Sequence, residues 1–292
     1  MTTTVDEPVR LDVGQAPPAR RRVKAAALAA VGWGVAIVFL APYLHMLLTA
    51  VRPQAELFTT PADYLPQAWQ WRNFVDVWRA APIWEYLRNT LIIAGLSTTV
   101  ALTVSVPAAY YTARHRFRGR QAFLLLVLVT QMFAPTALVI GLYREMVMLG
   151  LVNTYTALVL TNGAFNLAFS IWILHGFFSS IPYELEEAAA LDGCSRMQVL
   201  RWVTLPLAMP GVLTAMIFTF IAAWNEFVVA LTLTSTAARR PLTVGITAFV
   251  GQYQVQWQYL FAASLIAIIP VVLLFAAIER HLVGGLTAGS IK

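Results

Sequence analysis

Few side chains in this sequence have the types and spacing for acid–base or nucleophilic chemistry. The histidines are His45, His115, His175 and His281. They show no metal-ligand spacing and no HExxH pattern, and no G-x-S-x-G elbow occurs. The lysines are Lys24 and Lys292, and neither follows a phosphate-binding GxxxxGK[ST] loop. The sequence therefore predicts no catalytic residue, no metal site, and no cofactor or ATP bound by this chain.

Polar side chains inside apolar segments are the other candidates for chemistry. Glu226 follows Asn225 within a long apolar segment. A charge at the centre of a bilayer costs roughly 2.5–3.5 kcal/mol on insertion scales, so an intramembrane acid marks a site with a role. Further amides in apolar segments are Gln131, Asn162 and Asn166. These groups could line a pore or gate, and they could equally hold helices together by hydrogen bonds. Both interpretations stay open.

Composition places these residues in a membrane protein. Of the 292 residues, 59% are hydrophobic and only 12% are charged, whereas soluble domains carry about 25% charged residues. A helix needs about 20 mostly apolar residues to cross the hydrocarbon core. The segments that qualify are approximately residues 25–51, 88–113, 121–142, 155–178, 209–234 and 258–279. We therefore predict an all-α membrane protein with six transmembrane helices, with kinks at the mid-span prolines Pro107, Pro135 and Pro270.

The basic residues predict the orientation of these helices. They cluster at the ends of apolar segments, a distribution that is typical of membrane topology signals. The net charge of +6 therefore does not indicate a nucleic-acid partner. The short loop RHRFRGR, residues 114–120, is the strongest indication of a cytosolic segment. Both termini are then cytosolic. A disordered tail at 1–24 and a second tail at 285–292 flank a transmembrane domain at 25–284.

A polar stretch, EEAAALDGCSRMQVLRWVTLPL, separates the fourth and fifth apolar segments. Strong helix formers with acids in the first turn predict a short helix, which Asp192 and Gly193 end with a turn. Ser195 is placed to cap a second short helix, and Pro206 precedes the break before the next span. Helices of this length are too short to cross a bilayer. Loop 179–208 is therefore predicted to form a cytosolic projection that fits a groove on a partner protein.

This stretch resembles the EAA loop of permease subunits in ABC importers. The matching positions are Glu187-Ala188-Ala189, then Gly193, then Val203-Thr204-Leu205-Pro206. The departure from the family pattern is Val203, which stands where the family has isoleucine. Segments 149–160, 171–189 and 222–231, and the ending GLTAGSIK, resemble the second, maltose-type permease subunit of carbohydrate importers. The resemblance covers residues from about 25 to 292, and Ala168 stands where relatives often carry proline.

The resemblance implies the fold of type I ABC importer permeases, which are also called MetI-like. It implies half of a translocation path for a di- or oligosaccharide, of the trehalose or maltose type, in the inner or plasma membrane. The implied partners are a second permease subunit, two cytosolic ATPase subunits that bind ATP and Mg, an extracytoplasmic sugar-binding protein and membrane lipid. The residues implied to couple to the ATPase are Glu187, Ala188, Ala189, Asp192, Gly193, Leu205 and Pro206.

The outer loop 235–257 resembles the loop that in relatives enters the sugar cleft of the binding protein. Its residues Gln252, Tyr253 and Trp257 are chemically suited to displacing a sugar. The first outer loop, about 52–87, is rich in tryptophan and is predicted to anchor at the lipid headgroups.

Other functions remain open at this point. The nearest is an importer of the same class that carries a glycerol-phosphate or a glycerophosphodiester. An ion-coupled secondary transporter with Glu226 as its proton site is a second, but it leaves the EAA-like loop unexplained. An intramembrane enzyme is disfavoured because the sequence shows no paired nucleophile, base or metal set.

Overall fold

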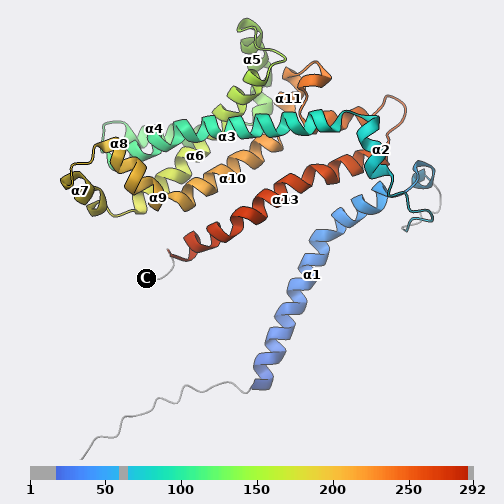
Figure 1. Cartoon of the computed structure of the whole chain (residues 1–292), viewed down its shortest axis with the longest axis horizontal. Coiled ribbons are helices and arrows are strands. Elements are labelled where there is room, and N and C mark those ends of the chain that lie inside the picture. Colours follow the sequence, from blue (N-terminus) through green and yellow to red (C-terminus); the bar gives the residue numbers. More distant parts are fainter. Residues whose placement is uncertain (1–17, 59–64, 289–292) are drawn as a thin grey trace, which may run out of the picture.

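The computed structural model describes residues 18–58 and 65–288 (Figure 1). The regular elements in these ranges are helices, and the β-structure there is an isolated bridge between Val250 and Val255. The long helices are α1 (Pro18–Ala50), α3 (Ile83–Arg114), α6 (Tyr155–Ser180) and α13 (Trp257–Ala288). The shorter ones are α2 (Asn73–Ala80), α4 (Arg120–Thr130), α5 (Pro135–Met148), α7 (Glu184–Leu191), α8 (Arg196–Val199), α9 (Leu205–Leu207), α10 (Met209–Trp224), α11 (Val228–Leu233) and α12 (Leu242–Gly245). The prediction of an all-α protein is confirmed.

Within the described residues, four helices are long and apolar enough to span a bilayer: α3, α6, and most of α1 and α13. Two bent pairs also qualify. One is α4 with α5, at an angle of 96°, and the other is residues 196–207 with α10, at 78°. Counting each bent pair as one span gives six spans among the described residues, in agreement with the sequence.

Two of the predicted spans are not continuous helices. The range 121–142 is interrupted at residues 131–134, and Pro135 opens α5 after the break where a kink was expected. Proline suits the first turn of a helix because its missing N–H has no intrahelical partner there. The range 209–234 is interrupted at residues 225–227, between α10 and α11.

Both predicted tails are partly helical. α1 begins at Pro18, inside the range predicted as a disordered tail, and α13 continues to Ala288, inside the predicted second tail. The remainder of these tails, residues 1–17 and 289–292, lies outside the described residues.

The core of the bundle lies between α3, α6 and α10, which run side by side (Figure 1). Phe178 of α6 is fully buried in a cluster with Ala109 of α3 and Ala215 of α10. A hydrogen bond of 2.9 Å joins Ser170 Oγ and Thr219 Oγ1 across α6 and α10. Small side chains at helix crossings allow the close approach from which membrane helices gain packing energy. We call the end of this bundle that carries α7 the α7 end, and the opposite end the α2 end.

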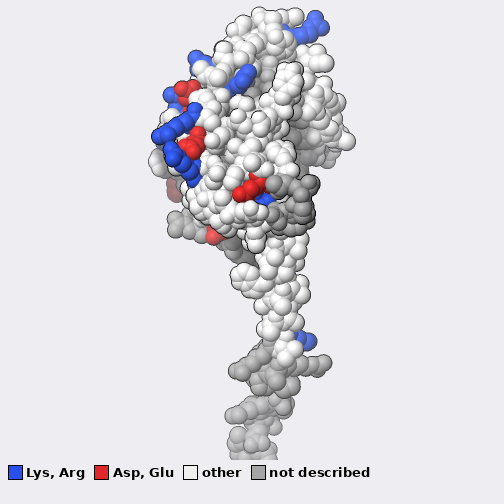
Figure 2. Space-filling view, turned by 90° about the vertical axis from the view of Figure 1, so that its right-hand side faces the viewer, with Lys and Arg blue, Asp and Glu red and all other residues white. Residues whose placement is uncertain are grey.

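α1 stands apart from the bundle for most of its length (Figure 1). Its apolar side chains there are exposed, among them Trp33 and Phe39, and beyond Lys24 its sequence carries no Asp, Glu, Lys or Arg up to Ala50, so Figure 2 shows this stretch of the helix in white. Its last residue, Ala50, is buried in a cluster with Val77 of α2 and Ala262 of α13. An apolar surface of this extent is one that lipid or another protein covers.

Candidate functional site

The loop between α6 and α10 folds into two short helices, as predicted. α7 carries Glu184, Glu186 and Glu187 in its first turn, where the helix dipole favours acidic side chains. α8 begins after Ser195, whose backbone N–H donates to Gln198 Oε1 at 2.8 Å. This bond is one half of a capping box, and it confirms Ser195 as the N-cap.

Gly193 ends α7 in a specific hydrogen-bonded turn. The N–H of Gly193 donates to the carbonyl of Ala190, and the N–H of Cys194 donates to the carbonyl of Ala189, both at 3.1 Å. Together these bonds form a Schellman motif. Gly193 has a φ of 86°, a left-handed conformation in which a Cβ costs energy. The offset between Glu-Ala-Ala and the glycine therefore places Gly193 at the position that caps the helix carrying Glu-Ala-Ala.

The second short helix leads into α10 through a bend. It continues from α8 through a π-helical turn, Leu200–Thr204, into α9. Leu205 and Pro206 belong to α9, and the chain turns by 78° at Ala208, between Pro206 and Pro210. α7, α8 and α9 therefore form a projection at one end of the bundle (Figure 1).

The surface of this projection mixes exposed apolar and charged side chains. Leu191 is 90% exposed, and Met197 and Trp202 are each 69% exposed. Of the residues predicted to couple to a partner, Glu187, Ala188, Asp192, Gly193 and Pro206 are exposed, and Ala189 and Leu205 are half-buried. Large apolar side chains left exposed beside polar ones are typical of a protein–protein interface.

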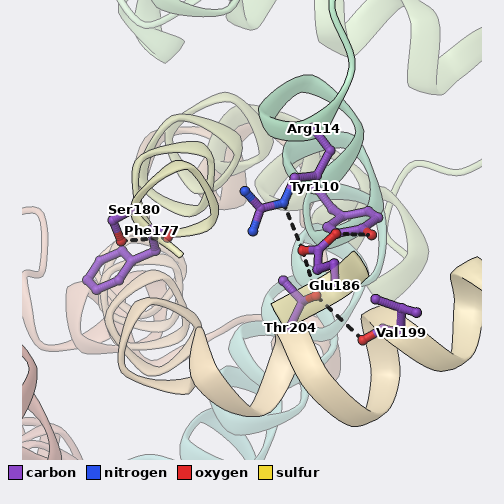
Figure 3. A network of polar contacts seen from close by, with 7 residues as sticks. All are labelled: Tyr110, Arg114, Phe177, Ser180, Glu186, Val199 and Thr204. Carbon is purple, nitrogen blue, oxygen red and sulfur yellow. Dashed lines mark hydrogen bonds and ion pairs between the residues drawn. The ribbon is translucent and has the colours of Figure 1, made fainter. Parts of the chain in front are cut away.

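Glu186 ties the projection to the bundle (Figure 3). It is 6% exposed, and its Oε1 accepts hydrogen bonds from Arg114 Nε and Thr204 Oγ1, each at 2.8 Å. Its Oε2 accepts a hydrogen bond from the Tyr110 hydroxyl at 2.9 Å. The Arg114 side chain is itself only 7% exposed. One carboxylate thus joins α7 to the end of α3 and to the π-helical turn that precedes α9.

In the sequence, Glu187 stands out as part of the EAA-like motif, whereas nothing there indicates the role of Glu186. The ion pair with Arg114 joins positions that are 72 residues apart, so no local spacing indicates it. Helical periodicity was the one available signal. Adjacent residues lie about 100° apart around a helix, so one of two neighbouring acids faces the bundle while the other faces outward.

A hollow of about 430 Å³ opens beside Glu186. It is lined by Glu187 and Ala190 of α7, by Arg196 of α8 and by Arg114 of α3. Arg114 Nη2 is buried and has no hydrogen-bond partner among the described residues. Arg114 therefore depends on Glu186 for its charge compensation.

Glu226 lies in the break between α10 and α11 and caps α11. Its Oε1 accepts the N–H of Val229 at 2.7 Å, and its Oε2 accepts the N–H of Ala230 at 2.8 Å. Its carbonyl accepts a hydrogen bond from Thr243 Oγ1 at 2.8 Å. The free N–H groups and the dipole at a helix start both stabilise a carboxylate. This geometry supports the structural interpretation of Glu226.

Asn162 and Asn166 donate within their own helix. Asn162 Nδ2 donates to the carbonyl of Leu158, and Asn166 Nδ2 donates to the carbonyl of Asn162, both at 2.9 Å. Asn162 also lines, with Glu226, a cavity of about 10 Å³, which is about the space that one water needs. The hydrogen bonds of these two amide nitrogens satisfy α6 itself and join no second helix.

Gln131 and Asn225 lie at separate places. Gln131 is exposed in the break between α4 and α5 and lines a hollow of about 210 Å³ with Trp172. Asn225 is exposed after α10 and lines a hollow of about 450 Å³ with Trp224. The structure therefore brings Asn162 and Glu226 together but does not gather all the predicted pore residues into one site.

Loop 235–257 ends in a tight hairpin that an isolated β-bridge closes. Gln252 and Tyr253 lie in this hairpin and are exposed, Tyr253 by 93%. Trp257 follows the hairpin as the first residue of α13, is 37% exposed and stacks on Phe261 with ring centroids 5.7 Å apart. The hairpin itself therefore carries the amide and the phenol, and the indole stands at the start of the next helix.

Comparisons with known proteins identify relatives of this architecture. The sulfoquinovosyl glycerol transport system permease protein SmoH of Agrobacterium fabrum is 37% identical over 251 residues, which are 86% of this chain and 88% of that protein. The trehalose/maltose transport system permease protein MalG of Thermococcus litoralis is 36% identical over 88% of this chain and 93% of its own length.

A solved structure shares the fold. It is a chain of a bacterial ABC transporter involved in the import of the acidic polysaccharide alginate, with a TM-score of 0.75 and 23% identity over 92% of this chain and 99% of that one. Residues 105–287, which include the capped helix pair and the Glu186 contacts, match the family described as "Binding-protein-dependent transport system inner membrane component". The chain belongs to this family of inner-membrane transport subunits.

Proposed function

We propose that this chain is one of two different permease subunits of an ATP-driven ABC sugar importer. It forms half of the translocation path for a di- or oligosaccharide. The observation that carries the proposal is the helix pair α7 and α8–α9, an exposed projection with the EAA spacing and a glycine cap at one end of an apolar bundle. Such a projection offers a surface on which a partner can act mechanically.

The partners follow from the two ends of the bundle. At the α7 end, taken as cytosolic, Glu187, Gly193 and their neighbours dock into two ATPase subunits that bind ATP and Mg. At the α2 end, taken as external, the hairpin with Gln252 and Tyr253 meets a sugar-binding protein. The exposure of both surfaces supports this arrangement. Both termini then lie in the cytosol, and the spans lie in the inner membrane.

The substrate class rests on the relatives. One is named for sulfoquinovosyl glycerol and another for trehalose and maltose, and each of these is a glycoside of two small units. Among the intramembrane polar residues, Gln131 is exposed beside the exposed indole of Trp172, and Asn225 is exposed in a hollow that the buried Trp224 also lines. Amide and aromatic groups suit sugar hydroxyls and sugar faces, so we assign substrate contact to these two amides.

Uptake by the reassembled complex tests this function. The two permeases, the ATPase and the binding protein are reconstituted in liposomes, and uptake of a glycoside panel is measured with ATP, without ATP and with an ion gradient. The expected result is ATP-dependent uptake of a two-unit glycoside, which Glu187→Lys abolishes. Uptake driven by an ion gradient alone contradicts the proposal, and uptake of a glycerol-phosphate compound alone moves the substrate to the alternative class.

Sidedness is tested with the single cysteine of the chain, Cys194, which lines the hollow beside α7. A membrane-impermeant maleimide should label it only after the cells are permeabilised. Labelling of intact cells would place the projection outside and overturn the assignment.

A further inference from the structure

α3 carries a buried polar cluster near each end, and each cluster holds a segment that is distant in the sequence. At the α7 end, Arg114 holds Glu186 of α7. At the α2 end, Asn89 holds loop 235–257. The helix between them is unbroken (Figure 1). At about 1.5 Å per residue, the two anchor points are about 37 Å apart.

The polar cluster at the α2 end, here called the outer cluster, is centred on Asn89, which is fully buried. Its Nδ2 donates to the carbonyls of Ala238 at 3.0 Å and Arg240 at 2.9 Å. Its Oδ1 accepts a hydrogen bond from the Tyr155 hydroxyl at 2.6 Å. Both hydrogens of the amide and its oxygen are therefore engaged. This one side chain fixes the main chain at the start of the loop and joins it to α6.

Neighbouring residues of α3 strengthen this attachment. Thr90 Oγ1 accepts the N–H of Leu242 at 2.7 Å. Gly245 lies so close to Tyr86 that a Cβ on this glycine would overlap the tyrosine ring. The segment that precedes the exposed hairpin is therefore held to α3 at its main chain. The contacts are a hydrogen bond to the N–H of Leu242 and the close approach of Gly245, which a residue with a side chain would prevent.

The polar cluster at the α7 end, here called the inner cluster, is centred on Glu186. Its partners Arg114 and Tyr110 belong to α3, and its third partner, Thr204, lies in the turn before α9 (Figure 3). Removing one side of a buried ion pair leaves an uncompensated charge, which is strongly unfavourable. α7 therefore cannot separate from α3 without leaving Arg114 buried and unpaired.

From these contacts we infer that α3 is the positioning element that couples the α7 projection to the external loop, with Glu186 and Asn89 as its anchor residues. The inference rests on the proposed function and deepens it, because it identifies the segment that moves with the ATPase and reaches the binding-protein surface. The competing route is α10, which follows α9 directly in the chain.

The test uses the complex with the partner permease, the ATPase and the binding protein in lipid nanodiscs. Its variants are Glu186→Gln, Asn89→Ala and the double variant. The measured quantity is the ATPase rate with sugar-loaded binding protein divided by the rate without it. Each single variant should lower this ratio about fivefold or more. The double variant should lower the ratio no further, because each substitution already interrupts the coupling through α3.

Glu145→Gln is the matched control. It neutralises an exposed acid on α5 and should leave the ratio unchanged. A wild-type ratio in both single variants overturns the inference, and so do losses that multiply in the double variant, because independent effects mean that no common element connects the two ends.

Softer variants cover the case in which Glu186→Gln prevents assembly. Tyr110→Phe and Thr204→Val each remove one hydroxyl donor to the carboxylate, and both should lower the ratio to a smaller extent. An unchanged ratio in both overturns the inference.

Failure of the proposed function has a different signature, namely a wild-type complex that shows no stimulation by sugar. Amide hydrogen exchange of the same complex then tests whether α3 connects its two ends. Asn89→Ala should speed exchange in α7, at the opposite end of α3. Unchanged exchange in α7 overturns the inference, whichever solute the complex carries.

Discussion

Replacing Gly193 tests whether main-chain conformation alone sets the cap of α7. Gly193 has a φ of 86°, and a Cβ built on it meets nothing within 4 Å. A substitution therefore acts through main-chain strain and not through a clash. A left-handed conformation costs an L-residue about 1–2 kcal/mol. β-Branched residues are the least tolerant of it, and asparagine is among the most tolerant.

The strain competes with the two hydrogen bonds of the cap. They are donated by the N–H groups of Gly193 and Cys194, and such bonds contribute about 0.5–1.5 kcal/mol each. The strain energy and the free energy of the two hydrogen bonds are of similar magnitude. In Gly193→Val the cap should therefore be open, with both hydrogen bonds broken, in a larger fraction of molecules. A loss of about 1–2 kcal/mol raises the open population about 5- to 30-fold. Gly193→Asn should stay close to the wild type and serves as the matched control.

Two assays follow this change in the assembled complex. Amide exchange should speed in the last turn of α7 for Gly193→Val and not for Gly193→Asn. The sugar-stimulated ATPase rate should fall in the same order, because the frayed turn no longer holds the docking surface. If the valine variant exchanges as slowly as the asparagine variant, the backbone explanation of this glycine is wrong.

Three further predictions concern packing, capping and the outer hairpin. Gly211→Ala places a Cβ into the ring of Phe177. Overpacking costs about 1–3 kcal/mol, so its melting temperature in detergent should fall below that of Gly176→Ala, whose Cβ meets open space; equal melting temperatures would contradict this packing. Glu226→Ala removes the acceptor of two N–H groups of α11. Loss of a cap costs about 0.5–2 kcal/mol, so exchange should speed within α11, and unchanged exchange there argues against the cap. Tyr253→Ala should abolish sugar uptake and leave the sugar affinity of the binding protein intact, whereas normal uptake speaks against a role for the hairpin.

The sequence was sufficient for the class of the fold and for the local shape of loop 179–208. Backbone groups in lipid must all be hydrogen-bonded, which leaves helices and closed barrels, and apolar segments of about 20 residues have the length of a membrane-spanning helix and not of a strand. The end of α7 and the start of α8 were equally predictable. A glycine cap and a serine N-cap act over a few neighbouring positions, as Gly193 and Ser195 do.

Only the tertiary structure decided where the spans break and which acid faces the bundle. Hydropathy adds up side-chain transfer energies, and a break in the helix at residues 131–134 or 225–227 changes none of them. The choice between Glu186 and Glu187 depends on the rotation of α7 against α3, which Arg114 fixes from 72 positions away. Such contacts depend on the packing of whole helices, and no short stretch of sequence contains that information.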